Sequence, residues 1–213
     1  MSMGKTALII GANRSIGLRL VKALQARGWT ATGSIRVSSK EDESVKDSII
    51  NASKAFGSGP LDLLINNGAV GTQHLKWDEH TSENMMRLFS TNGPVQAIKH
   101  FYPGLKRSKF AKVINISSGS ASITNNNGMN LGYRVSKTSL NQLTMTIAKE
   151  ARANGDNIAV VAVYSGHLAT RMSGFSFSHD MEEYINGVAN LMDTIDISDT
   201  GRYINWKGET VPW

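Results

Sequence analysis

The sequence predicts a doubly wound α/β fold, in which helices cover both faces of a parallel, Rossmann-type sheet. Short apolar runs of β type alternate with amphipathic helical stretches along the chain, which is typical of strands joined by crossover helices. The run Leu61–Ile65 is apolar almost without interruption, as expected of a strand that is buried on both faces. Glycines follow the first apolar run, where this fold places a tight turn between a strand and a helix.

Six strands are expected, each from a short apolar run of the kind that packs well in a sheet. They are Lys5–Ile10, Trp29–Ile35, Leu61–Ile65, Lys112–Ser117, Ile158–Tyr164 and Arg202–Trp206. Five helices are expected between and after them: Ile16–Arg27, Asp42–Phe56, Glu83–Leu105, Tyr133–Ala153 and Met181–Thr194. Ile16, Leu20 and Leu24 recur at helical spacing in the first helix, and we expect the third to tolerate Pro94 near a break. No repeat or linker divides residues 1–213, so we expect a single domain.

The composition narrows the classes of function. No stretch approaches the roughly 18 apolar residues of a membrane span, and the absence of Cys excludes disulfides and a cysteine nucleophile. The net charge is +6, but Lys and Arg are scattered, which favours a solvated surface over a nucleic-acid site. The His residues lack the spacing of metal ligands. We therefore expect a cytoplasmic protein without a metal site that binds neither nucleic acid nor membrane.

The first loop, Gly11–Gly17, leads from a predicted strand into a predicted helix. Free backbone N–H groups and the helix dipole make such a helix start a site for phosphate. The second strand runs into Arg36, at the place where a carboxylate would bind the ribose hydroxyl of NAD and an arginine would bind the 2′-phosphate of NADP. Arg14 lies within the loop and can reach the same phosphate. These positions favour NADP(H) over NAD(H).

Tyr133 and Lys137 are one helical turn apart at the start of a predicted helix, so their side chains share one face. They follow the strand Lys112–Ser117 and should lie at the edge of the sheet where such folds bind ligands. An ammonium group close to a phenol favours the phenolate. We therefore expect Lys137 to lower the pKa of Tyr133 from about 10 and so prepare it for proton exchange near neutral pH.

Five motifs in their order along the chain resemble those of the short-chain dehydrogenase/reductase family. They are the glycine loop Gly11–Gly17, the strand end Asn66-Asn67-Gly68-Ala69, the helical Asn92, Ser118 in Asn-Ile-Ser-Ser, and Tyr133 with Lys137. The string Tyr-Arg-Val-Ser-Lys and the ending from Gly201 to Trp213 are similar to the C-factor/sniffer-like branch, whose members include carbonyl reductases. The resemblance extends over essentially the whole chain.

The resemblance implies a role for each matching residue. Tyr133 would protonate a carbonyl oxygen as hydride arrives from a nicotinamide, and Ser118 would hydrogen-bond that oxygen. Lys137 would hold the nicotinamide ribose, and Asn92 would position a water that links Lys137 to solvent. Asn67 would contact the adenosine-side ribose. The implied cofactor-binding set is Gly11, Asn13, Arg14, Ser15, Ile16, Gly17, Arg36, Asn67, Tyr133, Lys137, Ser165, Gly166, Leu168 and Thr170.

Four departures from the family pattern concern the cofactor side. Ser15 replaces the middle glycine of the loop, Gly68-Ala69 inverts the usual order, and Tyr164-Ser165-Gly166 replaces the usual Pro-Gly turn. The stretch between Arg36 and Asn66 is too short to hold the family's third strand with its helices. That strand is at the edge of the family's sheet, so its loss leaves a continuous sheet of six strands. We expect an adenine pocket that is open on one side.

The expected function is NADPH-dependent interconversion of a carbonyl and an alcohol in a small molecule. Two other functions remain open, because fold resemblance alone does not choose between chemistries. One is a non-redox isomerase, dehydratase or cyclase that uses Tyr133 as acid and base. The other is an NADP(H)-binding regulator without turnover. Two of the long helices form the dimer interface in many relatives, so the resemblance also implies a possible homodimer.

Overall fold

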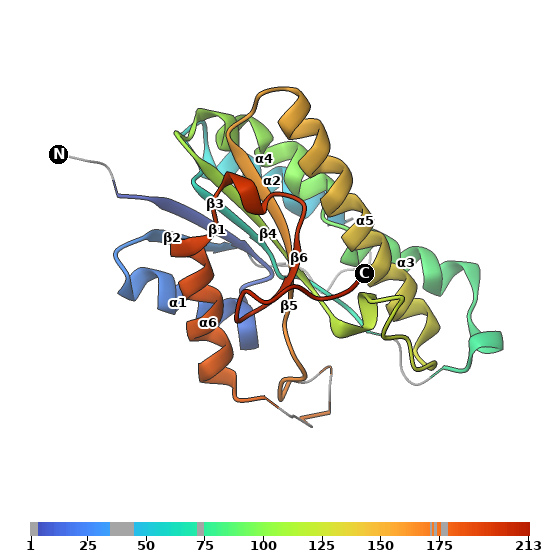
Figure 1. Ribbon diagram of the computed structural model, residues 1–213. Helices are drawn as coiled ribbons and strands as arrows, with labels where there is room; N and C mark the ends of the chain where they lie inside the picture. Colours follow the sequence, from blue (N-terminus) through green and yellow to red (C-terminus); the bar gives the residue numbers. More distant parts are fainter. Residues whose placement is uncertain (1–3, 35–44, 72–74, 171, 173, 176–178) are drawn as a thin grey trace.

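A computed structural model describes residues 4–34, 45–71, 75–170, 172, 174–175 and 179–213. Six strands lie within them: β1 (Thr6–Ile10), β2 (Thr30–Ser34), β3 (Leu63–Asn66), β4 (Ala111–Ser117), β5 (Ile158–Tyr164) and β6 (Tyr203–Asn205). They form one sheet in the order β2-β1-β3-β4-β5-β6, and every neighbouring pair is parallel (Figure 1). The predicted doubly wound fold is confirmed, and within the described ranges the sheet has six strands without the family's third edge strand.

Six α-helices lie within the described ranges: α1 (Ser15–Ala26), α2 (Val45–Phe56), α3 (Ser82–Asn92), α4 (Val95–Arg107), α5 (Leu131–Ala153) and α6 (Met181–Thr194). The short 3₁₀ helices are η1 (Trp77–Glu79), η2 (Gly119–Ala121) and η3 (Ile197–Asp199). Helices α1 and α6 pack on one face, while α2, α4 and α5 pack on the other (Figure 1). Within the described residues, no helix combines the length and the apolar character that a membrane span needs.

Alternation along the strands divides the core into two layers. In β1, Ala7 and Ile9 belong to the cluster under α1 and α6, whereas Leu8 belongs to the cluster under α2, α4 and α5. In β5, Val161 and Val160 divide in the same way. Successive side chains of a strand point to opposite faces, so a strand needs apolar residues throughout when helices cover both faces.

The single helix predicted over Glu83–Leu105 is wrong, because two helices, α3 and α4, occupy this stretch. The break is at Gly93, whose backbone is extended (φ −93°, ψ 113°), and at Pro94, which precedes the first residue of α4. Proline has no N–H for a helical hydrogen bond, and its ring disfavours the α conformation in the preceding residue. Asn92, the last residue of α3, is thereby placed at the end of a helix rather than in the middle of one.

Candidate active site

The predicted site residues follow the carboxyl ends of neighbouring parallel strands, which meet at one edge of the sheet (Figure 1). The glycine loop follows β1, Asn67 follows β3, Ser118 follows β4, and Ser165 follows β5. This edge is where open α/β sheets bind ligands. The topology therefore brings together residues that are far apart in the sequence.

The glycine loop packs closely against the end of β3. Gly11 has a φ of 77°, and a Cβ there would lie 2.8 Å from the Cα of Gly68. A Cβ on Gly17 would lie 2.4 Å from the carbonyl oxygen of Gly11. The Asn67 amide, Nδ2, donates to that same oxygen over 2.8 Å. Both glycines are therefore required by close contacts, and Asn67 supports the loop.

The first turn of α1 has the features of an anion site. Asn13, Arg14 and Ser15 are exposed and Ile16 is half-buried, and the first N–H groups of a helix have no acceptor within the helix. Ser15 has a φ of 47°, which lies in the left-handed region that favours glycine. The second predicted phosphate ligand, Arg36, lies outside the described residues. The predicted opening of the adenine pocket stays a prediction for the same reason.

Ser118 and Tyr133 lie together in the candidate site. Ser118 lies directly after β4, and its Oγ accepts a hydrogen bond of 3.2 Å from the N–H of Ser120. Tyr133 lies in the first turn of α5, and its phenol is close enough to the Ser118 side chain to interact with it. Burial raises the pKa of Tyr133, and the hydrogen bond with Ser118 opposes part of that rise. The phenol is therefore protonated at neutral pH.

Lys137 lies one turn further along α5, and only 2% of it is exposed. Its Nζ donates to the carbonyl oxygen of Ile116 over 2.9 Å and is 6.0 Å from the centre of the Tyr133 ring. Burial lowers the pKa of Lys137 to about 8. The expectation that Lys137 lowers the pKa of Tyr133 is wrong for this structure. The reason is that burial dominates at the phenol, and Ser118, not Lys137, supplies the opposing effect.

Asn92 joins three parts of the site. Its Oδ1 accepts from the N–H of Val70 over 2.8 Å, and its Nδ2 donates to the carbonyl of Val70 and to the hydroxyl of Ser136, over 3.0 and 2.9 Å. Asn92 thus fastens the segment after β3 to the helix that carries Tyr133. Among the described residues no hydrogen bond joins Asn92 to Lys137, so its role toward a water on Lys137 stays a prediction.

The segment after β5 carries the remaining predicted cofactor residues. Ser165 donates through Oγ to the carbonyl of Gly166 over 3.2 Å, and Gly166 has a φ of 72°. Leu168 is buried, and the carbonyl of Thr170 accepts from the N–H of Phe175 over 2.9 Å. No group of three or more His, Asp or Glu within the described ranges is arranged to hold a metal ion.

Sequence reasoning did not identify three polar residues beside Ser118. Asn141 accepts from the Ser117 hydroxyl over 2.7 Å, and its spacing of four from Lys137 and eight from Tyr133 could have revealed the shared helix face. The Tyr164 ring packs on Gly119, where a Cβ would lie 3.1 Å from the ring. Tyr203 reaches the Ser118 carbonyl from β6, and no spacing rule could have predicted a contact between two strands so far apart in the sequence.

The comparisons with known proteins agree with this geometry. The family model for short chain dehydrogenases matches residues 33–181. C-signal from Myxococcus xanthus is 27% identical over 159 residues, which are 73% of this chain and 95% of that protein. An NADPH-bound carbonyl reductase from chicken fatty liver has a TM-score of 0.87 at 27% identity and aligns over 99% of both chains. The carbonyl reductase Sniffer of D. melanogaster has a TM-score of 0.84 at 22% identity, over 99% of this chain and 100% of that one.

The family match covers more than half of the chain, and these relatives confirm the resemblance to the C-factor/sniffer-like branch. Fold, motif order and the arrangement of Ser118 with Tyr133 lead to the same assignment. The chain belongs to the short-chain dehydrogenase family of oxidoreductases.

Proposed function

We propose that this protein uses NADP(H) to interconvert a carbonyl and an alcohol in a small molecule, with Tyr133 as the general acid and base. The observation that carries the proposal is that the Tyr133 phenol and the Ser118 side chain lie together, close enough for Ser118 to lower the pKa of Tyr133, at the ligand-binding edge of the sheet. Two hydroxyl groups there can meet one carbonyl oxygen, which is what proton donation with charge stabilisation requires.

The protonation states favour the reductive direction. Burial raises the pKa of Tyr133, so its hydroxyl carries a proton to donate as charge develops on a carbonyl oxygen. Ser118 donates a second hydrogen bond to that oxygen and limits the charge that the phenol must neutralise alone. Lys137 lies one turn further along α5 as a buried cation, with its Nζ 6.0 Å from the centre of the Tyr133 ring, where it would hold the ribose of a bound nicotinamide nucleotide.

The residues present fit a nicotinamide dinucleotide. Gly11 and Gly17 let the loop pack closely against the end of β3, and α1 begins beside them, which gives the strand, tight turn and helix start that bind phosphate. A bound nicotinamide would supply or accept the hydride. Arg14 is exposed in the loop and would pair with a 2′-phosphate together with Arg36. The chicken relative, which is 27% identical, is described as NADPH bound, and this supports NADP(H) here.

Two measurements test the proposal. NADPH binding is followed by the fluorescence of the reduced nicotinamide, and turnover by loss of its absorbance with a panel of aldehydes and ketones. We expect binding and oxidation of NADPH, and Tyr133→Phe should lower turnover by about 100-fold or more while leaving binding nearly unchanged. Absence of binding at millimolar NADPH would contradict the proposal.

A regulator that binds NADP(H) without turnover is the second candidate. The left-handed backbone of Ser15 favours it, because a side chain there stands where backbone and pyrophosphate approach each other in the Rossmann loop. Binding of NADPH without oxidation by any carbonyl compound would favour this candidate, or a non-redox enzyme on the same scaffold. Oxidation of NADPH by a carbonyl compound that depends on Tyr133 would exclude both.

A further inference from the structure

Tyr203, the first residue of β6, connects the last strand to the centre of the site. Its side chain is almost completely buried, and its hydroxyl donates to the backbone carbonyl of Ser118 over 2.6 Å. Its ring lies between the sheet and η2, in a small apolar cluster that includes Ala121 and Ala162. A phenol that is buried usually has a hydrogen-bond partner, and here the partner is the main chain of a proposed active-site residue.

Without Tyr203, the backbone at the Ser118 carbonyl would have fewer hydrogen bonds to hold it in place. The ladder between β4 and β5 ends at Ser117, paired with Tyr164, so Ser118 lies beyond the sheet's regular hydrogen bonds. Its carbonyl accepts from the N–H of Ala121 over 2.9 Å as well as from Tyr203. With the carbonyl held on two sides, the orientation of the Ser118 side chain toward Tyr133 is restricted.

The Tyr203 ring is held in turn by the residues that follow it. The Trp213 ring lies 5.2 Å from it, centre to centre, at an angle of 36°. The Trp213 backbone oxygen accepts from the N–H and the hydroxyl of Thr124, over 3.0 and 2.7 Å. Val211 donates to the carbonyl of Tyr203 over 2.9 Å. The stretch from Tyr203 to Trp213 therefore packs against the loop that begins with Ser118 and stabilises it.

The electrostatics agree with a donor role for this hydroxyl. Burial raises the pKa of Tyr203, the phenols of Tyr164 and Tyr133 add to the rise, and the Asn141 side chain opposes part of it. The hydroxyl is therefore protonated wherever the enzyme would work, and it is close enough to Tyr133 for the two phenols to influence each other.

We infer that Tyr203 is a positioning residue: by holding the Ser118 carbonyl, it orients the Ser118 hydroxyl against Tyr133. This inference rests on the proposed function, since it assigns Tyr203 to the same proton-transfer site. The expected consequence of losing the hydroxyl is a slower chemical step with unchanged cofactor binding, because Tyr203 has no predicted contact with the cofactor.

Tyr203→Phe tests the inference, because it keeps the ring and its packing and removes only the hydroxyl. We expect kcat to fall about tenfold, as for loss of one orienting hydrogen bond, with the NADPH dissociation constant unchanged. Ser118→Ala with Tyr203→Phe should be no slower than Ser118→Ala alone, because the two residues act as one unit. A kcat equal to that of the unaltered chain, or penalties that multiply, would overturn the inference.

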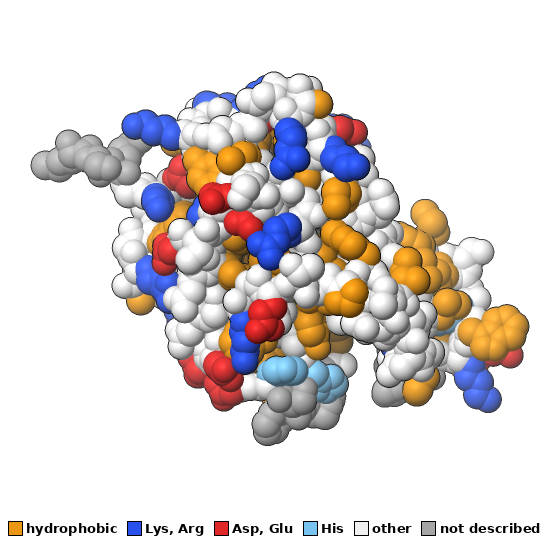
Figure 2. Space-filling model, in the orientation of Figure 1, with side chains coloured by type: hydrophobic (Ala, Val, Ile, Leu, Met, Phe, Trp, Pro, Cys, Tyr) orange, Lys and Arg blue, Asp and Glu red, His pale blue; other side chains and the backbone are white. Residues whose placement is uncertain are grey.

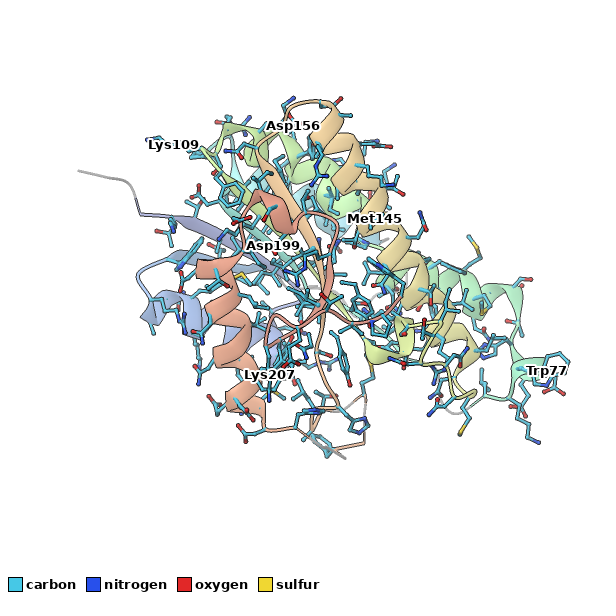
Figure 3. All side chains as sticks on the ribbon, in the orientation of Figure 1. Trp77, Lys109, Met145, Asp156, Asp199 and Lys207 are labelled. Carbon is cyan, nitrogen blue, oxygen red and sulfur yellow. The ribbon has the colours of Figure 1, made fainter. Side chains whose placement is uncertain are left out.

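Tyr102→Phe is the matched control. The Tyr102 hydroxyl also donates a hydrogen bond, to Asp156 over 2.7 Å, and Asp156 follows the far end of α5 from Tyr133 (Figure 3). This variant should leave kcat unchanged, which separates loss of any tyrosine hydrogen bond from loss of the one at Ser118.

A spectroscopic measurement keeps the inference testable if no substrate is turned over. The chain has 5 Tyr, so ¹³C labelling of the tyrosine Cζ atoms gives a small spectrum in which Tyr133→Phe identifies the Tyr133 signal. Tyr203→Phe should move that signal and Tyr102→Phe should not; an unmoved signal overturns the inference. If Tyr203→Phe does not fold, Trp213→Leu replaces it, because Trp213 is 40% exposed and touches the same ring. Trp213→Leu should likewise move the Tyr133 signal, and an unmoved signal would overturn the inference.

Discussion

Ser15 adopts a backbone conformation that glycine adopts without strain. Its φ of 47° costs a non-glycine residue roughly 1 kcal/mol, and its Cβ stands in the phosphate loop. Ser15→Gly should tighten NADPH binding by about three- to tenfold, measured by titration of cofactor fluorescence, with little change in Tm because the added flexibility of glycine offsets the relieved strain.

Ser15→Ala is the control, because it keeps the Cβ and removes only the hydroxyl. It should not tighten binding. If Ser15→Ala strengthens NADPH binding as much as Ser15→Gly does, then the hydroxyl rather than the backbone conformation limits affinity.

Lys137 makes stability depend on pH. Burial lowers its pKa from 10.5 to about 8, so between these values the unfolded chain binds the proton and the folded chain has released it. The free energy of unfolding contributed by Lys137 therefore rises with pH across about 8 to 10.5, by roughly 3 kcal/mol. Below pH 8 both states are protonated and the buried charge is a constant penalty.

Denaturant unfolding at a series of pH values checks this dependence. Lys137→Met should be more stable than the unaltered chain at pH 7 and should lose the rise above pH 8. Lys109→Met, which changes an exposed lysine, should keep it. If the free energy of unfolding of Lys137→Met still rises above pH 8, then another group causes the pH dependence.

At the scale of elements, buried polar side chains fasten α5 to the sheet. Asn66 donates to Asn115 over 2.8 Å, and Asn115 donates to the hydroxyl of Thr144 over 2.8 Å. Thr144→Val leaves the Asn115 donor without its partner, which should lower the free energy of unfolding by about 1–3 kcal/mol.

Thr146→Val is a close control on the same helix. Both hydroxyls donate to the carbonyl four residues earlier, over 2.8 Å for Thr144 and 3.0 Å for Thr146, but Thr146 is exposed and has no buried partner to leave unpaired. Its substitution should change stability by less than about 0.5 kcal/mol. Equal losses in the two variants, measured by urea unfolding, would mean that the link to Asn115 contributes nothing.

The elements also show what the sequence could predict. Strand runs such as Ile158–Tyr164 were predictable, because parallel strands covered on both faces must be apolar throughout. A break near Pro94 was expected, but the stretch was predicted as one helix that tolerates it, whereas the backbone at Gly93 and Pro94 separates α3 from α4. Tyr133, Lys137 and Ser118 were predicted as site residues. The direction of the Tyr133 pKa shift was not, since it depends on burial that no motif encodes.

At the scale of the whole molecule, α5 presents two different faces. Tyr133, Lys137 and Asn141 face the sheet, whereas Leu131 and Val135 line a groove of about 900 Å³ on the outer side. Phe89 of α3 and Val95, the first residue of α4, line the same groove. In Figure 2, many hydrophobic side chains lie at the end of the molecule where α3 and the start of α5 lie, with a few basic and acidic side chains beside them.

This outer face supports the expectation of a homodimer, with the groove of each chain covered by its partner. Val135 is 37% exposed in the groove. Val135→Glu would leave a charge in an apolar interface, at a cost of about 2 kcal/mol or more, so we expect a dimer dissociation constant at least about 30-fold higher. Ile197→Glu changes a comparably exposed apolar residue, 44% exposed, on η3, and should leave association unchanged.

Sedimentation equilibrium measures the mass of the unaltered chain and of each variant. A mass of 23.1 kDa for the unaltered chain at all concentrations would exclude the dimer, and equal weakening by both variants would place the interface elsewhere.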